Sequence, residues 1–445
     1  MEKRPSKKTE FTKCLFPTLN AMLNRNIGKW EMVLLFINGV IGAGIFGLPS
    51  RVFQMAGAYS IMALLLCMAA VFVIVLCFAE VGSRFRDTGG PYLYALAAFG
   101  PMPAFLTGWL LLLTRFITYA ALINLFVTYL GVFSAWFTLP LPRAVCITAV
   151  TLLLAIINHV GIRNTTRTNN LLTIGKLLPL LLFMAVGAFF IDPNRLSLDN
   201  APSFGQLSST VLLWIFAFGG FESILVNSGE VREPQKNLPF ALMAATLCIA
   251  AIYICILLVC IGTLPGLAET DKPLAAAAES FIGRKGAVFI GLGALVSILG
   301  TLNAIMLVGS RLPYAFSLHG QFPPAFARVH PRFATPTLSL WVYAIITLAV
   351  SLTQNFAAAA NLSAITRVMI YAIICIALLR LRQKDKGTET YLRLRYGKAL
   401  AWVALPLVAW LLSRSKPEEV FSIFVALSIG LLIYGCVWLA KRRQG

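Results

Sequence analysis

Two glycine-rich interruptions of apolar runs are the places where this chain could bind a small molecule. The first reads GVIGAGIFG from Gly39 to Gly47, and the second reads FAFGGFE from Phe216 to Glu222. Glycine clusters let a helix unwind and expose backbone N–H and C=O groups, which a bilayer tolerates only where they line a cavity or bind something. Exposed N–H donors suit an anion and exposed carbonyls suit a cation, so the two breaks together predict a site for a small zwitterion.

Two other interpretations of the first break are weaker. Gly42, Gly44 and Gly47 match the spacing G-x-G-x-x-G, but a dinucleotide site also needs a preceding strand and an acidic residue about 20 positions later. Neither accompanies the motif here. Glycines also allow two membrane helices to pack closely without binding anything. The matching break in a second span favours the binding interpretation, and paired broken helices are typical of a transporter.

The elements that carry these breaks belong to a membrane protein. Of the 445 residues, 59% are hydrophobic and 12% are charged, against about 45–50% and about 25% in soluble domains. Runs of roughly 20 apolar residues, each long enough to cross a bilayer, recur along the chain. We predict an all-α polytopic membrane protein with about twelve spans, at residues 31–54, 58–82, 103–131, 142–161, 170–191, 209–229, 238–263, 284–310, 337–353, 358–380, 398–413 and 419–440.

The basic residues gather in alternate connections between these spans. The net charge is +20, and with the N-terminus inside, most of the 37 lysines and arginines fall in inner segments. Outer loops hold few, such as Arg143, Arg195 and Lys272. This asymmetry predicts a multi-pass protein of the cell (inner or plasma) membrane with both termini cytoplasmic, and with basic ends that touch anionic lipid. It argues against nucleic-acid binding, because no folded basic domain is predicted.

The positions of the two breaks also predict how the chain is divided into repeats. Spans 1 and 6 are both glycine-broken, and five crossings separate them, so the second set of five would be inverted relative to the first. The predicted division is a cytoplasmic basic tail at 1–29, a first five-helix repeat at 30–192, a second inverted repeat at 205–382, two accessory helices at 397–440, and a cytoplasmic end at 441–445.

Four segments carry a specific resemblance. NGVIGAGIFGLP, FAFGGFES, EVREPQKNLP and HGQFPPAFARV resemble the signature segments of the amino acid–polyamine–organocation (APC) superfamily of amino acid permeases. The resemblance implies a LeuT-type 5+5 inverted repeat with broken helices 1 and 6. It also implies that the carboxylate of an amino acid meets amides of Gly42, Ala43 and Gly44. The ammonium would then meet carbonyls near Val40, Ile41, Phe216 and Gly219.

Two ionisable residues within the spans are candidates for coupling and gating. Lys176 resembles the lysine that takes the place of a sodium ion in sodium-independent members, where it would contact carbonyls of span 1 and a hydroxyl of span 8, Ser297 or Thr301. Its alternative is a lysine that snorkels to the inner surface. Glu222 resembles a gating or proton-linked acid in an inner vestibule, and its alternative is a structural hydrogen-bond bridge. Because both groups can exchange a proton, we expect proton coupling.

Three further charges need partners, since an ionisable group in a span is costly. Arg115 and Arg367 are expected to bind helix carbonyls or to pair with Glu80 or Glu222, and Arg115 could instead bind a substrate carboxylate. Glu80, near the inner end of span 2, is expected to be structural, with water close by.

The lining of the pocket is predicted mainly by comparison. The position of a substrate-stacking aromatic residue in an arginine/agmatine antiporter of the family is similar to Ile305 here. Aromatic Phe216, Phe218 and Phe221 surround the second break, and Ala217 lies between the first two. We therefore expect neutral, apolar or aromatic L-amino acids rather than arginine. The alternative for these phenylalanines is ordinary packing.

The leading hypothesis is a secondary active transporter that works by alternating access, with no enzymatic activity and no cofactor. The main alternative is an obligatory exchanger of amino acids, or of an amino acid and a polyamine. A channel would need a continuous polar lining, and a membrane enzyme would need clustered acids or histidines. A disulfide-linked heavy chain, known among light-chain relatives, is not expected, because residues 132–142 contain no cysteine.

Overall fold

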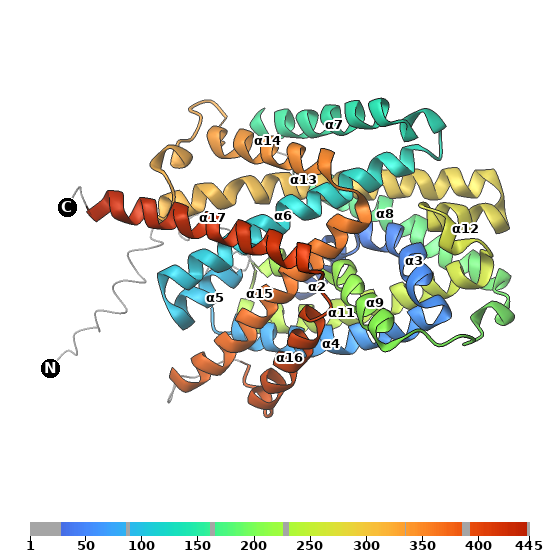
Figure 1. The fold of residues 1–445 in the computed structure, drawn as a ribbon, viewed down its shortest axis with the longest axis horizontal. Helices are drawn as coiled ribbons and strands as arrows, with labels where there is room; N and C mark the ends of the chain where they lie inside the picture. The colour runs from blue at the N-terminus through green and yellow to red at the C-terminus, as the bar shows by residue number, and fades with distance from the viewer. Residues whose placement is uncertain are drawn as a thin grey trace.

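The computed structural model describes residues 28–85, 90–160, 165–225, 231–333, 335–384 and 392–442 as helices joined by turns and short loops (Figure 1). The predicted tail up to residue 27 and the last three residues lie outside the described residues. Helices lie on each of the twelve predicted apolar runs, and only the ends of the runs at 142–161 and 209–229 pass beyond the described part.

The helices are α2 (Lys29–Val40), α3 (Ala43–Ala56), α4 (Ser60–Gly82), α5 (Gly90–Phe99), α6 (Pro101–Leu130), α7 (Pro140–Val160), α8 (Thr165–Gly187), α9 (Phe204–Phe218), α10 (Phe221–Ile224), α11 (Pro234–Thr263), α12 (Pro273–Ile282), α13 (Arg284–Leu318), α14 (Thr337–Thr353), α15 (Phe356–Lys384), α16 (Gly397–Leu412) and α17 (Pro417–Arg442). Seven helical stretches in the described residues are long and apolar enough to cross a membrane, and five shorter helices are also apolar.

The helices differ in how deeply they are buried. In the most apolar window of α6, 89% of the residues are buried, and α6 packs against α13, α14 and α15. In α17 the corresponding share is 11%, and side chains such as Phe421 and Phe424 are exposed. Exposed apolar side chains on a long helix are expected where the surroundings are lipid rather than water. Helix α6 is therefore central, whereas α17 lies on the outside of the bundle (Figure 1).

The two predicted interruptions are present in the structure. Helix α2 ends at Val40, Ile41 is extended, and α3 starts again at Ala43 after Gly42. Helix α9 ends at Phe218, Gly219 is extended, and α10 begins at Phe221. Between them Gly220 has a φ of +127°, a conformation that favours glycine. The sequence thus breaks both helices where its glycines cluster.

Candidate binding site at the two helix breaks

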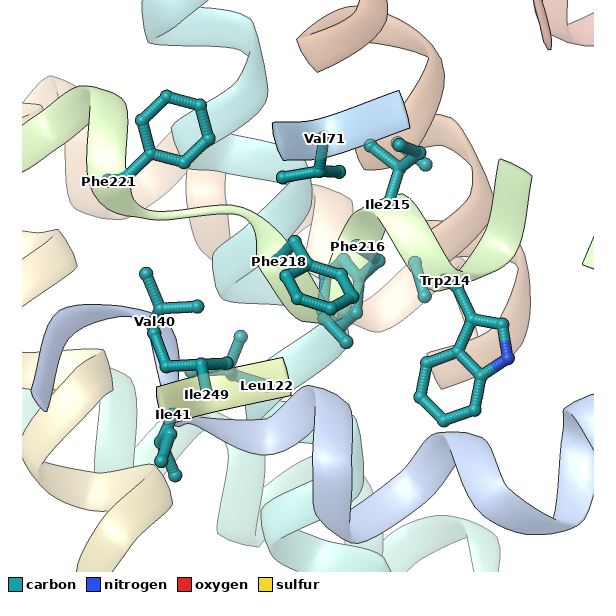
Figure 2. Close-up of a cluster of buried hydrophobic side chains, with 14 of the residues drawn as sticks. Val40, Ile41, Val71, Leu122, Trp214, Ile215, Phe216, Phe218, Phe221 and Ile249 are labelled. Atoms are coloured by element: carbon teal, nitrogen blue, oxygen red, sulfur yellow. The ribbon is translucent and has the colours of Figure 1, made fainter. Parts of the chain in front are cut away.

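The two breaks touch each other and form a single place in the fold. A Cβ atom added to Gly44 would lie 2.7 Å from the Cα of Ala217, and one added to Gly220 would lie 2.5 Å from the carbonyl oxygen of Gly39. Such contacts are possible only because both positions are glycine. Figure 2 shows the result, with Val40 beside the unwound stretch that joins Phe218 to Phe221.

Lys176 of α8 occupies the first break. Its Nζ donates a hydrogen bond to the carbonyl of Asn38 and another, of 2.9 Å, to the carbonyl of Ile41. Only 3% of this residue is exposed, so it does not snorkel to the surface. The expected hydroxyl contact is not formed: Thr301 donates to the carbonyl of Ser297, and the Ser297 hydroxyl has no partner in the described structure. An ammonium thus satisfies carbonyls that the interrupted helix leaves without their usual partners.

Glu222 occupies the second break and is fully buried. One carboxylate oxygen accepts a 2.9 Å hydrogen bond from the backbone N–H of Gly220, and the other accepts one from Nη1 of Arg367 on α15. Arg367 also donates to Thr118 of α6 at 3.1 Å and to Ser363 at 3.3 Å. The pair therefore ties the start of α10 to α6 and α15. In this conformation the carboxylate is a hydrogen-bonded bridge rather than a group facing a vestibule.

Of the other buried charges, Glu80 lies apart from the breaks, whereas Arg115 interacts with the ion pair of the second break. Glu80 accepts two 2.6 Å hydrogen bonds from Arg382 and one of 3.3 Å from Arg84. It joins α4 to the end of α15 and is fully buried. Arg115 is buried on α6, one turn before Thr118, and interacts electrostatically with Glu222 and Arg367.

Tyr253 of α11 was missed at the sequence level, although it contacts both breaks. Its hydroxyl lies 2.9 Å from the carbonyl oxygen of Ala217 and 3.4 Å from that of Val40. A hydroxyl in an apolar helix needs a partner when it is buried, and Tyr253 is the one tyrosine of α11. The one phenolic hydroxyl in this apolar helix was the sequence feature that could have identified Tyr253 as part of the site.

Three of the four predicted backbone acceptors are already in use, but each keeps capacity. The carbonyl of Phe216 accepts from the N–H of Gly219, that of Ile41 accepts from Lys176, and that of Val40 lies 3.4 Å from the Tyr253 hydroxyl. Each carbonyl oxygen has a second lone pair. Gly42 caps the N-terminus of α3, so the amides of Ala43 and Gly44 belong to the first turn, whose N–H groups have no partner within the helix.

The aromatic side chains at the second break pack against neighbours. Phe216 meets Phe356 edge-on, Phe218 meets Tyr253, and Phe221 stacks on Tyr371. A cavity of about 10 Å³ remains between the breaks, α4 and α11, with Val40, Phe218 and Phe221 in its wall. This is room for about one water molecule. Ile305 is 5% exposed in α13 and does not line this cavity, so a bound amino acid would require the site to open.

The described structure is thus a helical membrane protein with two broken helices that meet at a closed centre, where buried charges bind the unwound backbone. The sequence model of the amino acid permease family matches residues 27–440, so the chain belongs to this family, within the APC superfamily. It is accordingly a multi-pass membrane permease that serves amino acid transport, and not an enzyme.

Relatives within the family differ in what they carry. The chain is 27% identical to the methylthioribose transporter of Bacillus subtilis (strain 168), over 93% of both chains. It is 27% identical to the branched-chain amino acid permease BcaP of the same organism, over 93% of this chain and 92% of that one. It is 29% identical to the chloroplastic cationic amino acid transporter 9 of Arabidopsis thaliana, over 69% of this chain and 58% of that one. Family membership alone does not define the substrate.

Proposed function

We propose that this permease is a proton-coupled, sodium-independent secondary transporter of neutral L-amino acids, with apolar or aromatic side chains preferred. It works by alternating access. The observation that carries the proposal is the position of Lys176, whose ammonium sits on two carbonyls of the first break. The ammonium of Lys176 takes the place of a sodium ion, and the proton that it carries can be exchanged during transport.

The substrate class follows from the groups around the breaks. The first-turn amides of α3 suit a carboxylate, and the carbonyls of both breaks suit an ammonium. The cavity wall there includes the apolar side chains of Val40, Phe218 and Phe221. A side chain that buries apolar surface is stabilised in such a site, whereas a charged one would lose its hydration without gaining a partner. The similarity to BcaP agrees with this class.

The proposed topology is that of the sequence analysis. Twelve helices cross the membrane, the unit at 30–192 and the unit at 205–382 form the inverted repeat, and 397–440 forms the accessory pair. Both termini are cytoplasmic. Protons and membrane lipid are the partners. In this arrangement the broken helices, α2–α3 and α9–α10, occupy equivalent places in the two units.

The test is uptake of a panel of labelled L-amino acids into proteoliposomes that contain the purified protein. We expect saturable uptake of neutral amino acids into empty vesicles, stimulated by an inward proton gradient and unchanged when sodium is replaced by choline. Uptake that requires internal amino acid at every pH would show an exchanger instead. Uptake that requires sodium would contradict the role given to Lys176.

A variant isolates the coupling group. Lys176→Ala leaves two buried carbonyls without their charged donor, so we expect at least a tenfold loss of uptake and a flattened pH dependence. Lys285→Ala removes an exposed lysine at the start of α13 and is the matched control. Uptake by Lys176→Ala that keeps the wild-type pH dependence would remove Lys176 from the coupling mechanism.

A further inference from the structure

A second site lies away from the helix breaks, where the loop after α13 meets the start of α14. A surface cleft of about 410 Å³ opens there between residues 325–330 and the first turns of α14. Helices α7 and α14 lie together along one edge of the bundle (Figure 1). The cleft is therefore on the periphery of the protein, and no residue of the two helix breaks lines it.

Three hydrogen-bond donors surround this cleft. Arg328 is exposed, and no hydrogen bond or ion pair of its guanidinium occurs in the described structure. Nδ1 of His330 accepts from the backbone N–H groups of Arg332, at 3.2 Å, and Phe333, at 3.4 Å. The neutral ring therefore carries its proton on Nε2, which remains a donor. The buried hydroxyl oxygen of Thr337 has no partner in the described structure.

The rest of the wall is apolar. Val329, Leu338 and Trp341 line the cleft, and Val329 and Leu338 are 44% and 39% exposed. Trp341 is half-buried one turn into α14, and tryptophan is typical of the boundary between membrane and water. The ligand that fits donors on one side and apolar side chains on the other is amphiphilic, with an anionic group that accepts hydrogen bonds.

We propose that this cleft binds an anionic phospholipid. Its phosphate accepts from Arg328, His330 and Thr337, and its acyl chain lies along Val329, Leu338 and Trp341. The loop lies on the side that the charge distribution assigns to the cytoplasm, where anionic lipids are enriched and where basic pockets beside helices recognise their headgroups. Arg328 gives this site a net positive charge, so a lipid with net negative charge is preferred to a zwitterionic one. The proposal does not depend on the transported substrate.

The test is native mass spectrometry of the purified full chain with added palmitoyl-oleoyl phosphatidylglycerol or palmitoyl-oleoyl phosphatidylcholine. We expect the wild type to keep phosphatidylglycerol at least tenfold more tightly than phosphatidylcholine. Arg328→Gln should remove most of this preference, and His330→Asn should weaken it while keeping an acceptor for the backbone N–H groups. Arg395→Gln, an exposed arginine outside the cleft, is the matched control and should keep the preference.

Two further results distinguish specific lipid binding in this cleft from nonspecific electrostatic attraction of anionic lipid to the protein. Ala325→Phe fills the cleft without changing any charge, so it should weaken phosphatidylglycerol binding as well. Equal binding of the two lipids by the wild type, or equal losses in Arg328→Gln and Arg395→Gln, would overturn the proposal. Displacement of phosphatidylglycerol by millimolar inorganic phosphate would identify a site for free phosphate and would overturn it too.

Discussion

The two helix breaks look alike in the sequence, but the structure stabilises them differently. At the first break, a single ammonium from another helix, that of Lys176, binds two carbonyls. At the second, Glu222 binds the N–H of Gly220 within its own segment and is itself held by Arg367 of α15. The first break is stabilised by a cation that binds uncharged carbonyl groups. The second is stabilised by an ion pair whose two charges cancel.

Because of this difference, the charge at the first break can change, whereas the ion pair at the second break is fixed. A cation on carbonyls can be replaced by another cation, or can lose its proton, without leaving an opposite charge behind. An ion pair cannot lose one member in this way, because the remaining charge would stay buried without a counterion. We infer that the first break responds to substrate and protons, whereas the second anchors α10 to α6 and α15.

The largest expected effect tests the anchor. Arg367→Met leaves the Glu222 carboxylate buried without its partner, which costs about 3–5 kcal/mol of stability. We expect little folded protein in the membrane and no measurable uptake. Size-exclusion chromatography and thermal unfolding of the detergent-solubilised protein measure the loss.

The double variant Glu222→Gln/Arg367→Met shows whether charge is the cause. It removes both charges and keeps a side chain that can accept from the Gly220 N–H, so most of the lost stability should return. Uptake should stay impaired, because the connection to α6 and α15 is gone. If the double variant is as unstable as Arg367→Met, then packing of Arg367, and not the ion pair, stabilises this break.

The next effect compares two glycines of the first break. At Gly44 an added Cβ would lie 2.7 Å from the backbone of Ala217, which cannot move without shifting α9. At Gly42 the nearest atom would be the Thr301 hydroxyl at 3.5 Å, an ordinary contact. Gly44→Ala should therefore cost about 1–3 kcal/mol and most of the uptake, and Gly42→Ala should cost much less. Thermal unfolding and uptake, measured side by side, check the order. The reverse order would mean that the breaks separate in the transporting protein.

The sequence predicts those parts of the fold that are determined by residues close together in the chain. Apolar runs specify helices through their length, and the glycine at 220, with its φ of +127°, specifies the second break through backbone freedom. Helix α12 was not predicted, because its ten residues are too few to register as a span. The carbonyl contacts of Lys176 were implied only by the resemblance to a family.

The pairing of buried charges could not be predicted in the same way. Glu222 and Arg367 are 145 positions apart, and Glu80 and Arg382 are 302 apart. At the sequence level Arg115 and Arg367 were equal candidates for either acid. Only the packing of α15 against α4, α6 and α9 decides which arginine reaches which carboxylate.

The smallest expected effect concerns the group that joins the two breaks. Tyr253→Phe removes the hydroxyl that lies near the carbonyls of Ala217 and Val40 but keeps the ring against Phe218. Loss of one hydrogen bond to a buried carbonyl costs about 1 kcal/mol, so the protein should fold normally.

Uptake is the more sensitive measurement for this variant. If the hydroxyl holds the two breaks in register, the apparent KM for the amino acid should rise several-fold while the maximal rate changes little. Tyr119→Phe is the control, because it removes a buried hydroxyl that contacts Thr151 of α7 and neither break. A KM change shared by both variants would indicate a general loss of stability. A rise in KM confined to Tyr253→Phe would mean that this hydroxyl links the fixed second break to the responsive first break. Movement at one break would then shift the other.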